Sequence, residues 1–97
     1  MGLDVIEEKN LNDVIEYALD YPNVVLAGVK SILSQNVMLG DFGYGLYLGY
    51  VSGVFFDGFL RRNSRFLNDE EMSGFHAVLF KRSPEILLKI KVHLGLK

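Results

Sequence analysis

The sequence predicts an all-α protein, a compact array of four to five helices around one helix rich in glycine and aromatic residues. Apolar residues recur at helical spacing near the N-terminus, an uncharged run covers residues 42–56, and helix start and stop signals mark the second half. The 97 residues fit a single domain over 1–97. Apolar residues make up 49% of the chain and charged residues 23%, which is enough apolar material for a core.

The first predicted helix follows Asn10, where five apolar residues share one helical face: Leu11, Val14, Ile15, Ala18 and Leu19. Asn10 or Asn12 is expected to cap the free N–H groups at its start. Pro22 is expected to end it, because the residue before a proline avoids the α conformation. Residues 3–9 are expected to form a short helical prelude with two inward-facing side chains, Leu3 and Ile6.

A second helix is expected over residues 24–39. One face carries only apolar side chains, those of Val25, Val29, Ile32 and Leu33. Polar residues such as Lys30 and Gln35 fall on the opposite face. Gly40 and Asp41 then provide a stop signal, since glycine is common just past the end of a helix.

The third segment, 42–60, is expected to be the central helix. Its first fifteen residues carry no charge, and Gly45, Gly49 and Gly53 recur at every fourth position. Such a row leaves a flat strip where another backbone can approach closely. Each interior glycine costs about 1 kcal/mol relative to alanine, so the row predicts compensation by close packing.

Tyrosines follow a different spacing in the same segment, with Tyr44, Tyr47 and Tyr50 three residues apart. We expect them to lie in the core or in a dimer interface rather than to stack bases, because no basic residue is interleaved with them. Two or three glycine-punctuated strands are the alternative for this segment, since Tyr, Val and Phe favour sheets. No Asn-Gly or Asp-Gly turn divides the run, which favours the helix.

The second half of the chain contains a linker and two further predicted helices. The linker begins at 61–65, and Asn68 followed by three acidic residues marks the next helix start. Ser83-Pro84 is expected to begin a separate last helix that ends at Gly95. Residues 86–94 also alternate apolar and polar side chains, so an α+β fold with C-terminal strands is the alternative.

No motif for catalysis, a metal or a cofactor is present, so a non-enzymatic protein without cofactors is expected. The absence of cysteine excludes disulfides and thiolate ligands, and His76 and His93 each lack a histidine at i+4. The acidic N-terminus has no signal-peptide pattern, which favours a cytoplasmic location. The uncharged run would span only about 22 Å as a helix, so no membrane span is expected.

Charge is distributed unevenly, with a net −6 over residues 1–60 and +4 over residues 61–97. The leading hypothesis is a self-associating interaction module, because the other helices of so short a chain have little surface with which to cover the apolar segment 42–60. A homo-oligomer or another protein is the expected partner. The alternative is a small nucleic-acid-binding or regulatory protein that uses a basic cluster: Arg61, Arg62, Arg65, Lys81 and Arg82.

Overall fold

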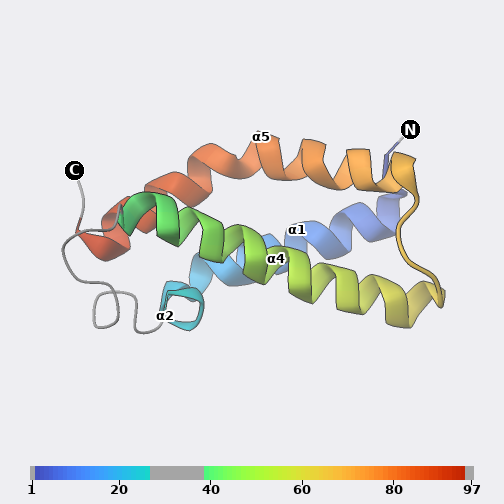
Figure 1. Ribbon diagram of the computed structural model, residues 1–97, viewed down its shortest axis with the longest axis horizontal. Coiled ribbons are helices and arrows are strands. Elements are labelled where there is room, and N and C mark those ends of the chain that lie inside the picture. The colour runs from blue at the N-terminus through green and yellow to red at the C-terminus, as the bar shows by residue number, and fades with distance from the viewer. Residues whose placement is uncertain (1, 27–38, 96–97) are drawn as a thin grey trace.

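The computed structural model describes residues 2–26 and 39–95. These residues form four helices, with the labels of Figure 1: α1 Val5–Asp20, α2 Pro22–Val25, α4 Leu39–Asn63 and α5 Asp69–Leu94. The three long helices lie side by side, with α1 and α5 running in one direction and α4 in the other (Figure 1). No strand occurs in these two ranges, so the all-α prediction is confirmed and both strand alternatives are wrong.

Helix α1 begins earlier than the apolar spacing predicts. The Asp4 carboxylate accepts a 2.8 Å hydrogen bond from the backbone N–H of Glu7, so Asp4 is the N-cap. The predicted prelude and first helix are therefore one continuous element, and Asn10 and Asn12 lie inside it. Ile6 is exposed rather than inward-facing, because it lies off the row of buried residues that begins at Glu7.

The predicted second helix lies mostly outside the described residues, which resume at Leu39. The start of this predicted helix, Val24 and Val25, lies in α2. Helix α2 begins earlier, at Pro22, and the first position of a helix suits a proline. The predicted stop at Gly40 and Asp41 is wrong, because both residues lie within α4. The helical assignment of 42–60 is confirmed, and α4 continues three residues into the predicted linker.

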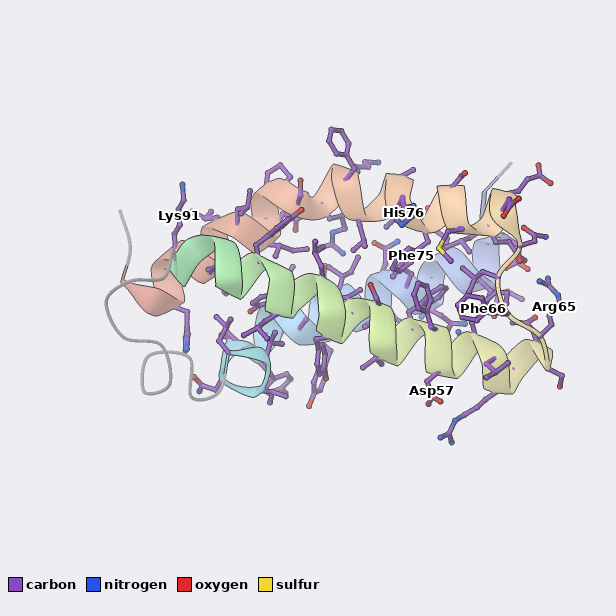
Figure 2. All side chains as sticks on the ribbon, in the orientation of Figure 1. Asp57, Arg65, Phe66, Phe75, His76 and Lys91 are labelled. Atoms are coloured by element: carbon purple, nitrogen blue, oxygen red, sulfur yellow. The ribbon has the colours of Figure 1, made fainter. Side chains whose placement is uncertain are left out.

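The core is the space between α1, α4 and α5, and each helix contributes a row of buried side chains. The largest are aromatic or branched: Leu11 and Ile15 from α1, Tyr47, Val51, Phe55 and Phe59 from α4, and Phe75, Leu79, Ile86 and Ile90 from α5. Phe55 stacks on Phe75 with ring centroids 5.6 Å apart. Phe66 and Phe75 lie between α4 and α5 near the connecting loop (Figure 2), and both contact the ring of Phe56.

Tyr47 connects α4 to the end of α1 by a buried hydrogen bond. Its hydroxyl donates to the backbone carbonyl of Ala18 at 3.1 Å. In a continuing helix that carbonyl would accept from the N–H of residue 22, but residue 22 is a proline and has no N–H. Burial raises the pKa of Tyr47 to about 12, so the hydroxyl keeps its proton and remains a donor.

Replacing Tyr47 with phenylalanine is expected to lower the free energy of unfolding by about 1–3 kcal/mol, because the Ala18 carbonyl would stay buried without a donor. Chemical denaturation monitored by circular dichroism measures this change. The partly exposed Tyr44 provides the control, since Tyr44→Phe removes a hydroxyl whose oxygen can reach water. Equal stability of Tyr47→Phe and the wild type would contradict this role for the hydrogen bond.

Helix α5 begins as predicted and then continues through the expected break. Asn68 and Glu71 form a reciprocal capping box at its start. Pro84 lies inside the helix, so the prediction of a separate helix beginning at Ser83 is wrong. Pro84 cannot donate to the carbonyl of Phe80, and the Ser83 hydroxyl donates to it instead at 2.9 Å. The predicted stop at Gly95 is confirmed by its left-handed φ of 72°.

Candidate interaction surface

The residues of α4 form rows in steps of four, and the inner and outer rows differ sharply in composition. The inner row is buried: Gly43, Tyr47, Val51, Phe55 and Phe59. An α-helix turns 100° per residue, so a residue two positions from a buried one lies about half a turn away. The outer row is exposed and consists of Gly45, Gly49, Gly53, Asp57 and Arg61.

The three glycines of the outer row face open space. Apart from its chain neighbours and the nearby backbone of its own helix, a Cβ atom built on Gly45, Gly49 or Gly53 would meet no atom of the described residues within 4 Å. No backbone in residues 2–26 and 39–95 therefore makes the predicted close approach. Each glycine keeps its helix penalty of about 1 kcal/mol relative to alanine, and no contact with the described part of the chain offsets it.

The three tyrosines do not form a single row as the spacing predicts. Tyr47 is fully buried, whereas Tyr44 and Tyr50 are half-buried and pack against the edges of the core. Steps of three residues turn a helix by 300°, so successive tyrosines are displaced by 60° and spread across its inner half. The prediction of core tyrosines is thus right for Tyr47, and Tyr50 forms part of the rim of the glycine row.

A shallow groove of about 330 Å³ follows the seam between α1 and α4, next to the glycine row. Its lining is mainly apolar: Asp13, Val14, Tyr17, Tyr50 and Val54. Tyr17 is 47% exposed and Val54 is 44% exposed. Sequence reasoning missed both residues, because α1 was read only for its buried face and Val54 only as part of an apolar run.

The uncharged outer face ends at Asp57, which points away from the bundle (Figure 2). The Asp57 carboxylate pairs with the Arg61 guanidinium at 3.0 Å, an ordinary i,i+4 ion pair on an exposed helix face. Between Gly43 and Phe56 α4 has no charged residue. The result is a flat, uncharged strip of backbone with a half-exposed aromatic and aliphatic rim, which we call the glycine face (Gly45, Gly49, Gly53, Tyr50 and Val54).

The predicted basic cluster is divided in space, and carboxylates of the same chain neutralise most of it. Arg65 lies beside the first turn of α5, where it pairs with Glu71. Lys81 and Arg82 lie about 20 Å further along the same helix. Lys81 has no ion pair with any of the residues described. The four arginines each pair with an acid: Arg61 with Asp57, Arg62 with Glu7, Arg65 with Glu71, and Arg82 with both Glu16 and Glu85.

Glu7 is a buried carboxylate that sequence reasoning missed. It lies four residues before Leu11, in line with the buried row of α1, where a charged residue is unusual. Arg62 donates two hydrogen bonds to it, at 3.0 and 2.6 Å, and Asn63 donates a third at 3.0 Å. These bonds, chiefly the two from Arg62, lower the pKa of Glu7 to about 2. The network joins α1 to the end of α4.

Neither a metal site nor a membrane-crossing helix is found in the described ranges 2–26 and 39–95. These residues contain no group of three or more His, Asp or Glu side chains placed to hold a metal ion. No helix among them is both long and apolar enough to cross a bilayer. Comparison of the chain with protein-family models, curated proteins and solved structures finds no match.

Proposed function

We propose that the protein is a non-enzymatic self-association module that pairs with a second copy of itself through the glycine face of α4. The observation that carries this proposal is the outward row Gly45, Gly49 and Gly53, around which residues 2–26 and 39–95 leave open space. Three solvent-facing glycines weaken a helix that alanine would strengthen. A partner helix against the row offsets this loss, because the absence of side chains lets two backbones approach closely.

A second copy suits this face because its strip and its rim are complementary in shape. Two glycine faces related by a two-fold axis place the rim of one copy, Tyr50 and Val54, beside the flat strip of the other. Tyr17 and Tyr50 extend the contact across the α1–α4 groove, and tyrosine is enriched in protein interfaces. No charged side chain lies between Gly43 and Phe56, so two copies meet there without like-charge repulsion.

The basic residues do not favour the nucleic-acid alternative. Binding to a nucleic acid would require arginines that are free to contact its phosphates and to displace the counterions around them. Arg62 and Arg82 instead each join two helices of the same chain through ion pairs.

Cysteine cross-linking tests the proposal directly, because the chain contains no cysteine of its own. We expect Gly45→Cys, Gly49→Cys or Gly53→Cys to form a disulfide-linked dimer under mild oxidation, since a disulfide needs two Cα atoms within about 7 Å. Ser73→Cys, on the exposed face of α5, is the matched control. If none of the three glycine positions cross-links more than Ser73→Cys, α4 does not pair with its copy through this face.

A further inference from the structure

The outward side of α5 carries a second apolar surface, in the C-terminal half of the helix from Phe80 onward. Phe80 is 82% exposed, Leu88 63% and Val92 70%, and Leu87 is also exposed. Helix α5 bends in this half (Figure 1), which contains Pro84. We call this surface the α5 face (Phe80, Leu87, Leu88 and Val92). It lies on a different helix from the glycine face and stands independently of the proposed dimer.

Basic side chains accompany the α5 face, whereas the acid within it is already paired. Lys81 and Lys91 are exposed, and neither forms an ion pair with any residue in 2–26 or 39–95. Lys91 projects from the bundle near the C-terminal end of α5 (Figure 2). The Glu85 carboxylate accepts hydrogen bonds from Arg82 at 3.0 and 2.9 Å, and Arg82 also pairs with Glu16, so one guanidinium serves both carboxylates. The face therefore combines large apolar side chains with two lysines that have no ion pair among the described residues.

This combination disfavours a second copy as the occupant and favours an anionic one. Two α5 faces brought together would place Lys81 and Lys91 of both copies in one contact, and two of the nearby acids, Glu16 and Glu85, are already bound to Arg82. Toward α1, a groove is lined by Leu88 and Val92 of the α5 face together with three acids, Glu16, Asp20 and Glu85, and one base, Lys89. An anionic occupant would therefore contact the outermost part of α5, away from that groove.

From this charge and exposure pattern we infer that the α5 face binds an anionic lipid surface. Phe80, Leu87 and Leu88 would enter the headgroup boundary of the bilayer, as the apolar side of an amphipathic helix does. Lys81 and Lys91 extend along their alkyl chains and place their ammonium groups at the lipid phosphates and carboxylates. The helix would lie in the plane of the membrane surface and would not cross it.

Vesicle co-sedimentation with the full-length chain tests this inference. We expect binding to vesicles of phosphatidylcholine with about 30% phosphatidylserine, and much weaker binding to phosphatidylcholine alone or at high salt. The double variant Phe80→Ser, Leu88→Ser should lose binding. The variant Lys81→Gln, Lys91→Gln should bind about tenfold more weakly, because each lysine near an anionic surface contributes attraction.

Val54→Ser is the matched control, since it removes an exposed apolar side chain from the glycine face and should leave vesicle binding unchanged. Circular dichroism establishes that each variant retains its helices. The inference is overturned if the wild-type chain stays in the supernatant with anionic vesicles. It is equally overturned if Phe80→Ser, Leu88→Ser changes the solution mass and not the vesicle binding, since the α5 face then contacts protein.

Discussion

Replacing Arg62 with alanine is expected to lower the free energy of unfolding at pH 7 by about 3 kcal/mol, one of the two largest effects of a surface change in this protein. Without Arg62 the Glu7 carboxylate remains buried and loses two hydrogen bonds and its counter-charge. Chemical denaturation at pH 7 measures the loss. Arg61→Ala is the control, because it breaks an exposed i,i+4 pair and should cost less than about 1 kcal/mol.

The pH dependence of stability provides an independent test of the same network. The pKa of Glu7 is about 2 in the folded chain and near its ordinary value of 4.5 in the unfolded chain. The stabilisation is therefore complete above pH 4.5 and is lost as the pH falls from 4.5 toward 2. It amounts to about 2–3 kcal/mol after allowance for the partly solvated Arg62. Glu7→Gln should abolish this part of the acid dependence, and an unchanged pH profile would contradict the assignment.

Replacing all three outer glycines of α4 with alanine is expected to stabilise the isolated chain while weakening its self-association. In the monomer each added Cβ meets open space, so the helix gains up to about 1 kcal/mol per site and about 2–3 kcal/mol in total. In the dimer the same three methyl groups separate the two backbones. Denaturation at concentrations where the chain is monomeric measures the first effect, and sedimentation measures the second.

Gly74→Ala is the matched control for that experiment, because Gly74 has the close backbone contact that the α4 glycines lack. A Cβ on Gly74 would lie 2.6 Å from the Cα of Gly2 and 2.6 Å from the backbone nitrogen of Leu3. This substitution should therefore destabilise the chain, by about 1–3 kcal/mol. Should the triple alanine variant also be destabilised, the α4 glycines cannot face open space.

The sequence predicted those parts of the fold that depend on local signals. The Asn68 start, the Gly95 stop and the helical path of 42–60 follow from capping and spacing, and all three are confirmed. The start of α1 was missed because the first turn, which Asp4 caps, adds no residue to the row of buried apolar side chains. Ile6, for example, is exposed. The predicted break at Ser83-Pro84 was wrong for two reasons. The Ser83 hydroxyl donates to the Phe80 carbonyl, which Pro84 cannot reach with an N–H, and the residues before and after the proline, Leu79 and Ile86, are both buried in the core.

The interaction surface depends on pairings between distant residues, which spacing alone does not reveal. The glycine row was visible in the sequence, but its direction follows from which row of α4 packs against α1 and α5. The spacing of Tyr44, Tyr47 and Tyr50 resembles a row, although only Tyr47 reaches the core. Likewise, Glu7 and Arg62 are 55 residues apart, and only the antiparallel packing of α1 on α4 brings them together.

Sedimentation equilibrium at several protein concentrations is the measurement that tests the central claim most directly. The wild-type chain is expected to sediment at micromolar concentration with twice its monomer mass of 11.0 kDa. Gly49→Leu, whose side chain fits the open space of the monomer but would separate two paired backbones, is expected to sediment at 11.0 kDa while remaining folded. Ser73→Leu, on the exposed face of α5, should keep the dimer mass. A wild-type mass of 11.0 kDa throughout, or a Gly49→Leu variant that associates as strongly as the wild type, would contradict pairing through the glycine face.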